Sequence, residues 1–161
     1  MVIEYKSIKL ITSMKNVFYL CTTFMLLSMS CAFAQKQVSF TSHKTGSVVT
    51  SQQITVEGTA NNVPDDGHVW ILVQRAGFNG WYPQGRGERL PQENWTCIVF
   101  LGETDLDKGK YDIAVVVVND EVHRKLAIWV QTAEREGKYP AIDFPVVIGS
   151  NYQAFITVDR R

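Results

Sequence analysis

The pattern of apolar positions predicts a mainly β protein built around one strongly apolar strand. The stretch 111–120 holds four consecutive valines, preceded by Tyr111 and Ile113. Branching at Cβ favours an extended backbone, and successive side chains of a strand point to opposite faces of its sheet. Because both faces of this stretch are apolar, we expect it at the centre of a sheet, with other elements packed on both sides.

Other segments have the length of a strand and are flanked by the turn residues that typically end strands. His68–Gln74 is also apolar on both faces, whereas Gln53–Gly58 alternates and predicts Ile54 and Val56 facing inward. Pro83 restricts its segment to the edge of a sheet. The expected strands are 38–41, 53–58, 68–74, 81–84, 95–101, 111–118 and 154–158, with the first at an edge.

After residue 120 the apolar period changes from that of a strand to that of a helix. The apolar positions are Val122, Leu126, Trp129, Val130 and Ala133. The pattern predicts a helix over 121–136, with Asn119 or Asp120 as the N-cap and Gly137 ending it. We expect the stripe of Leu126, Trp129 and Val130 to cover the outer face of one sheet.

About seven short strands and one helix indicate an antiparallel, immunoglobulin-like β-sandwich with the helix packed on a sheet face. The sequence between Val38 and about Asp120 resembles bacterial secreted immunoglobulin-like or fibronectin-like modules. The resemblance rests on the strand Ile54-Thr-Val-Glu-Gly-Thr-Ala60, the Pro64-Asp-Asp-Gly67 turn before a Trp-bearing strand, and the strand led by Tyr111. It implies an adhesive or accessory role. The chain lacks the paired cysteines of antibody domains.

The first 34 residues have the three parts of a secretory signal. A basic residue, Lys15, precedes an apolar run over 17–29, which ends in the small-x-small sequence 32–34. Met14 fits a natural start. We expect cleavage to leave one domain over 35–161, located in the periplasm, on the cell surface or outside the cell. An uncleaved membrane anchor is the alternative.

Lipidation of Cys31 is disfavoured because Ser28 occupies the position where a lipoprotein signal has a branched apolar residue. Removing the leader also removes Cys21 and Cys31. Cys97 is then the one remaining cysteine, so an internal disulfide is excluded.

The balance of basic and acidic residues limits the classes of binding partner to be expected. The whole chain has 16 basic and 16 acidic residues, and the chain from Gln35 is slightly acidic. Because no basic run appears, nucleic acid and anionic membrane surfaces are not expected partners. No membrane span is expected after signal cleavage.

The sequence offers weak candidates for catalysis or metal binding. Cys97 with His68 or His123 would form a nucleophile and base, but Cys97 lies in an apolar strand, where cysteine acts as a small hydrophobe. The histidines lack ligand spacing. Residues 105–109 begin like a calcium loop, yet Val116 stands where the twelfth-position Glu belongs, so a polar turn is expected. We therefore predict that the protein is not an enzyme and that it binds neither a metal ion nor a cofactor.

The candidate binding surface is the loop-rich aromatic region 78–95. Its candidate ligand-binding residues are Trp81, Tyr82, Gln84, Arg86 and Trp95. Rings that stack on a sugar, beside amide and guanidinium groups, are typical of glycan recognition. The alternative is that the rings seal the core. The sequence favours an exported, non-enzymatic module that binds a glycan or cell-wall polymer. A structural subunit that binds a protein partner through a sheet edge is the second hypothesis, and a small hydrolase the third.

Overall fold

The computed structural model describes residues 37–89, 93–104 and 106–161. The predicted signal peptide, the start at Met14 and the lipidation of Cys31 all fall outside the described residues. Residues Glu88 and Arg89 are described for their backbone. Within the described ranges, no helix combines the length and the apolar character needed to cross a membrane.

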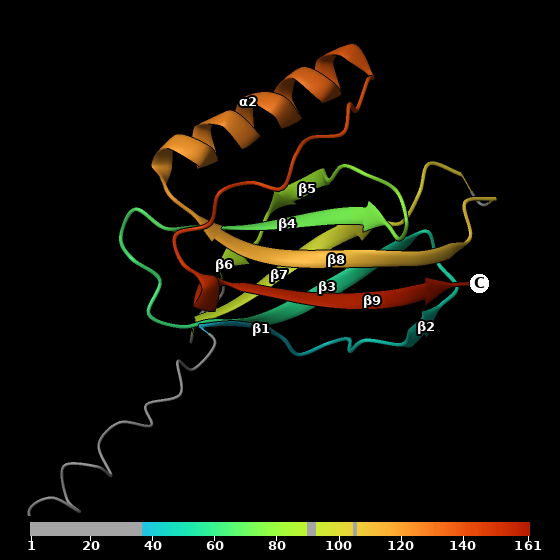
Figure 1. Ribbon diagram of the computed structural model, residues 1–161, viewed down its shortest axis with the longest axis horizontal. Helices are drawn as coiled ribbons and strands as arrows, with labels where there is room; N and C mark the ends of the chain where they lie inside the picture. Colours follow the sequence, from blue (N-terminus) through green and yellow to red (C-terminus); the bar gives the residue numbers. More distant parts are fainter. Residues whose placement is uncertain (1–36, 90–92, 105) are drawn as a thin grey trace, which may run out of the picture. The chain divides into compact units, whose positions relative to one another are not determined.

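The nine described strands form two sheets that face each other (Figure 1). Sheet A has the order β1 (Val38–Phe40), β3 (Gln53–Ala60), β7 (Asn94–Phe100) and the two-residue β6 (Glu88–Arg89). Sheet B has the order β2 (Ser47–Val49), β9 (Gln153–Arg160), β8 (Gly109–Val118), β4 (His68–Arg75) and β5 (Tyr82–Arg86). The mainly β, sandwich-like arrangement of two sheets is confirmed.

One strand pair departs from the predicted antiparallel pattern. The strand β2 runs parallel to β9, while the other described pairs are antiparallel. The cause is that β1 and β2 belong to one edge segment, which leaves sheet A after Phe40 and joins sheet B at Ser47. The direction of β2 is therefore fixed by β1.

A second segment, β5 to β6, changes sheets on the opposite side of the sandwich. Between the two strands, the Gly87 amide donates to the Val69 carbonyl in sheet B at 3.1 Å. The amide of Phe100 in sheet A donates to the side-chain oxygen of Gln84 at 2.8 Å. Strands that switch sheets form the corners of sandwiches and cover edges that otherwise invite pairing with other chains.

The central position of β8 is confirmed. It lies in the middle of sheet B, between β9 and β4. Its inward residues, Ile113, Val115 and Val117, belong to the core between the sheets, and its outward residues, Ala114, Val116 and Val118, to a second apolar layer. All six are 0% exposed. The sequence of apolar residues on both faces therefore corresponds to burial on both faces.

The helix α2 (Asp120–Glu136) covers part of the outer face of sheet B (Figure 1). The side chain of Asn119 accepts from the Val122 amide at 3.0 Å, and Gly137 ends the helix with φ of 64°. Leu126 and Val130 pack with Trp70 and the outer residues of β8, as predicted.

Trp129 has a different role from the predicted one. Its ring packs against Tyr139 in an edge-to-face arrangement, with ring centroids 6.2 Å apart. Its indole N–H donates to the Pro140 carbonyl at 3.1 Å. The side chain thus fixes the chain that follows α2. The helical period placed Trp129 on the apolar stripe but could not show that the returning chain lies against that side of the helix.

The returning segment 138–149 has no helix or strand apart from one isolated bridge, and it packs as part of the second apolar layer. Ile142 forms an isolated bridge with Trp81, with amide-to-carbonyl distances of 2.8 and 2.9 Å. Phe144 and Val147 pack with the outer residues of sheet B. Its apolar residues are spaced irregularly, because they follow a surface rather than a helix or strand period.

The turn between β7 and β8 is held by two buried side chains. The Tyr111 hydroxyl donates to the Asp107 carbonyl at 2.6 Å. Arg160, which is 2% exposed, donates from Nη1 to the carbonyls of Leu101 and Thr104, each at 2.8 Å. The turn also uses the Asp107 carboxylate, whose pKa is lowered chiefly by the hydrogen bond from the Thr104 amide.

Candidate binding site

Trp95 is a core residue. It is 0% exposed, its ring meets Phe40 edge-on at 5.3 Å, and its indole N–H donates to the Thr59 carbonyl at 3.1 Å. The inward position on β7 and the absence of a side chain at Gly58 make room for the ring. A ring in this place cannot stack on a ligand, so the core-sealing interpretation applies to Trp95.

Tyr82 and Gln84 lie on β5, at the edge of sheet B. Tyr82 is 37% exposed. The amide of Gln84 is already engaged, because its oxygen accepts from the Phe100 amide and its nitrogen donates to the Tyr82 carbonyl at 3.3 Å. Gln84 therefore ties β5 to β7, and Tyr82 is the more accessible of the two to a ligand.

Trp81 belongs to a group of three rings, here called the aromatic patch: Trp81, Phe144 and Phe155. The ring centroid of Trp81 lies 5.1 Å from that of Phe144 and 6.1 Å from that of Phe155. The centroids of Phe144 and Phe155 lie 5.6 Å apart. The rings come from three separate segments. Phe155, opposite Ala114 in the register of β9 and β8, is 48% exposed, so the patch is open to solvent on this side.

A row of polar side chains lies beside the aromatic patch. Gln74, Asp112 and Thr157 are opposite one another across β4, β8 and β9. They lie two residues along from the row that contains Phe155, which is about 7 Å at the rise of a strand. The Thr157 hydroxyl donates to the Asp112 carboxylate at 2.6 Å. This face of sheet B thus combines exposed ring surface with carboxylate, hydroxyl and amide groups.

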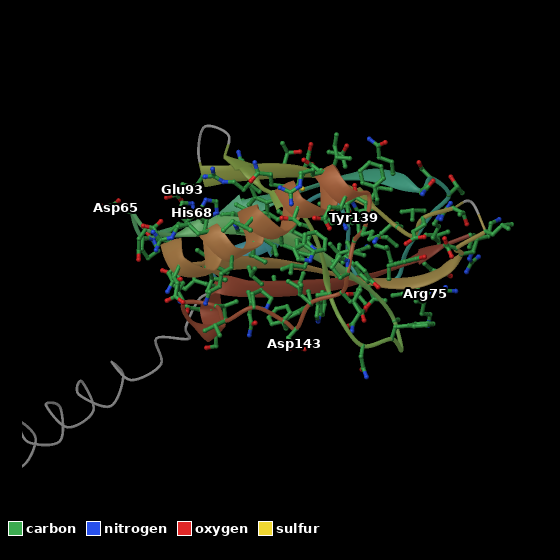
Figure 2. All side chains as sticks on the ribbon, turned by 90° about the horizontal axis from the view of Figure 1, so that it is seen from above. Asp65, His68, Arg75, Glu93, Tyr139 and Asp143 are labelled. Atoms are coloured by element: carbon green, nitrogen blue, oxygen red, sulfur yellow. The ribbon has the colours of Figure 1, made fainter. Side chains whose placement is uncertain are left out.

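Arg86 contributes to a different group, here called the histidine cluster: His68, Arg86, Asp120 and His123. Nε2 of His68 lies 2.6 Å from Oδ1 of Asp120, and Nη2 of Arg86 lies 3.4 Å from Nδ1 of His68. The imidazoles of His68 and His123 are stacked, with centroids 3.9 Å apart and an interplanar angle of 18°. Figure 2 shows His68 at the same end of the molecule as Asp65, with Arg75 at the other end of β4.

The cluster was not predicted from the sequence, because 55 positions separate the two histidines. Pairing of β4 with β8 brings them together, since His68 lies opposite Val118 and α2 begins two residues later. In the sequence, each histidine lies near an apolar strand, since His68 begins β4 and His123 follows β8 by a few residues. This pattern indicates a cluster only when β4 and β8 are known to be neighbours.

Hydrogen bonds and charges define the protonation of the cluster. The Trp70 indole N–H donates to Nδ1 of His123 at 3.1 Å, so this imidazole is neutral. Burial, followed by the charges of His68 and Arg86, lowers the pKa of His123. The hydrogen bond from His68 lowers the pKa of Asp120. Both ring nitrogens of His68 and Nδ1 of His123 have hydrogen-bond partners, and the described residues contain no group of three or more potential metal ligands.

Cys97 is a buried thiol, whereas a nucleophile would be bonded to a basic histidine. Its thiol contacts the Ile98 carbonyl at 3.4 Å, and burial raises its pKa to about 11. The histidines have Asp120, Arg86 and Trp70 as partners instead. A thiol with this pKa is protonated at neutral pH and a poor nucleophile.

Comparison of the sequence with protein-family models found no match, and comparison with curated proteins found no relative.

Proposed function

We propose that the chain is an exported, non-enzymatic binding or accessory module of the immunoglobulin-like type. The order of strands supports this assignment, because β1-β3-β7-β6 and β9-β8-β4 correspond to the A-B-E-D and G-F-C sheets of such domains. The bond from the Tyr111 hydroxyl to a backbone carbonyl four residues upstream matches the tyrosine corner of the F strand. In this correspondence, α2 and the segment 138–149 form a long insertion between the last two strands.

We propose that the aromatic patch binds a glycan or a cell-envelope polymer. The observation that carries the proposal is the half-exposed ring of Phe155, which lies against Trp81 and Phe144 and beside the Asp112–Thr157 pair. Apolar sugar faces stack on rings, while hydroxyl groups bond to neighbouring carboxylates and amides. Of the residues first predicted, Trp81 stays in the proposed site, whereas Tyr82 lies opposite Val73 of the core between the sheets and outside the three-ring group.

The test is a fluorescence titration of the protein with a panel of glycans and cell-wall fragments. A ligand that stacks on Trp81 changes its emission and saturates. Trp81→Ala should abolish the change and weaken binding at least tenfold. Tyr82→Ala should have a smaller effect, because Tyr82 lies outside the three-ring group. If Trp81→Ala binds the same ligand as tightly as the wild type, the patch is not the site.

A protein partner bound at a sheet edge is the second candidate, and the short length of β2 favours it. The strand β2 pairs with β9 only from Val158 to Arg160, so among the described strands the first half of β9 has β8 as its one neighbour. A partner strand added there would protect the amide of Phe155 from hydrogen exchange. Such a complex should survive Trp81→Ala, which separates the two candidates.

A further inference from the structure

We propose that the histidine cluster is a pH-sensitive latch, which holds the first turns of α2 on sheet B at neutral pH and releases them in acid. The cluster joins three elements. His68 comes from β4, Arg86 from β5, and Asp120 and His123 from the first turn of α2. It lies where β8 ends and α2 begins, so its contacts decide whether the start of the helix stays on the sheet.

The contacts of His123 require a neutral ring. Its Nδ1 accepts the indole N–H of Trp70, an acceptor role that is lost when Nδ1 gains a proton. Its ring lies flat on His68 at 3.9 Å, where two imidazolium charges would repel each other. Protonation of His123 therefore removes one hydrogen bond, and once His68 is also protonated it makes the stack repulsive.

Four charged or titratable groups face His123, and their signs favour release. Arg86 on β5, Arg124 on α2 and a protonated His68 on β4 oppose a positive charge on His123, while Asp120 on α2 favours it. Asp120 is already bonded to His68 and can balance one proton on the imidazole pair. A second proton has no further carboxylate among these groups, so it disrupts the stack.

The sign of the pH dependence follows from the lowered pKa of His123. A histidine whose pKa is lower in the closed state than in the open state stabilises the closed state fully above its usual pKa of about 6.5. This stabilisation is lost as the pH falls below that value. The equilibrium constant for release then rises up to about tenfold for each pKa unit that separates the closed and open states.

Release has a structural consequence in the second apolar layer. Trp70, Val116 and Val118 pack under α2 and are 2%, 0% and 0% exposed. Lifting the first turns of the helix exposes these side chains to solvent. Acid should therefore uncover an apolar surface on sheet B while leaving the core between the sheets intact.

The test is amide hydrogen exchange of the untagged full chain at pH 7.5 and 5.5, corrected for the intrinsic effect of pH. We expect opening of the first two turns of α2 to increase several-fold, up to about tenfold over this pH range, with little change in β3 and β7. His123→Gln and His123→Phe remove the titrating group and should abolish the increase. His43→Gln is the matched control, since His43 bonds to Ser42 outside the cluster and should leave the increase unchanged.

An increase that persists in both His123 variants would overturn the proposal, as would an equal increase throughout the sandwich. If neither variant folds, the wild-type chain still decides the question. The opening of α2 must follow the same midpoint as the ring protons of His123 in an NMR titration. A midpoint that differs by more than one pH unit would also overturn it.

Discussion

Arg160 shows how much of the fold can depend on one side chain near the end of the chain. Its guanidinium is buried beside the β7–β8 turn and bonds to carbonyls separated from it by more than 50 positions. A buried charge is tolerated only where hydrogen bonds replace its hydration. The alternating pattern of β9 marks Arg160 as inward, but the chemistry of its surroundings is visible only when the turn is in place.

Arg160→Met should destabilise the protein by about 3 kcal/mol, because hydrogen bonds from a charged donor are lost and buried carbonyls stay unsatisfied. Urea unfolding of the two proteins measures the difference. Arg161→Met is the control, since Arg161 is exposed and pairs with Asp159 at the surface, and it should change stability by less than about 0.5 kcal/mol. Equal effects of the two substitutions would show that the carbonyl contacts of Arg160 do not matter.

Cys97 allows a second test at the residue scale. Burial raises its pKa from 9.0 to about 11, so in the folded protein the thiolate fraction at pH 8 is about a hundredfold lower than in the unfolded chain. Alkylation by iodoacetamide should be slower by at least this factor and should increase with pH towards 11. Peptide mass spectrometry separates Cys97 from Cys21 and Cys31. Rapid alkylation in the folded state at pH 7 would revive the hydrolase hypothesis.

At the scale of elements, the sequence predicted best where a regular period coincides with burial. Strand β8 and helix α2 were both expected from their periods, and Asn119 and Gly137 cap the helix as the residue types suggest. The sheet switches of β1–β2 and β5–β6 were not predicted, because β2 and β6, with three and two residues, carry no measurable period. The packing of the segment 138–149 on sheet B was not predicted, because its apolar residues have no regular spacing.

The contribution of the helix N-cap to stability can be tested directly. Asn119→Ala removes the acceptor for the Val122 amide and should lower the free energy of unfolding by about 1 kcal/mol. Asn119→Asp keeps a side-chain acceptor and places a negative charge at the helix N-terminus, so its stability should match or exceed that of the wild type. Thermal denaturation monitored by circular dichroism distinguishes the two. A similar loss in both variants would contradict the role of the cap.

The packing of β3 against Trp95 allows a second test at the scale of elements. A Cβ at Gly58 would lie 1.9 Å from the Ser39 carbonyl and 2.3 Å from the Trp95 ring. Gly58→Ala should therefore cost about 3 kcal/mol through overpacking. The neighbouring, exposed Glu57 provides the control, and Glu57→Ala should have little effect in the same urea unfolding experiment. A stable Gly58→Ala protein would mean that Trp95 is less tightly held than its burial indicates.

At the scale of the whole molecule, the candidate site could be predicted only in part. The sequence identified an aromatic region, but strand alternation sends Trp95 into the core, and the cross-strand arrangement brings Trp81 to Phe144 and Phe155. Phe144 and Phe155 lie more than 60 positions from Trp81. A ligand surface assembled from such distant segments has no local pattern by which a sequence reveals it.

The two outer faces of the sandwich offer a matched comparison for the proposed function. Phe155 on sheet B and Phe100 on sheet A are 48% and 50% exposed, yet only Phe155 belongs to the aromatic patch. The most direct measurement is the calorimetric affinity of Phe155→Ala and Phe100→Ala for the glycan that binds the wild type most tightly. The proposal predicts about tenfold weaker binding for Phe155→Ala, near 1.4 kcal/mol, and an unchanged affinity for Phe100→Ala. Equal affinities of the two variants, or a loss confined to Phe100→Ala, would contradict a binding site on sheet B.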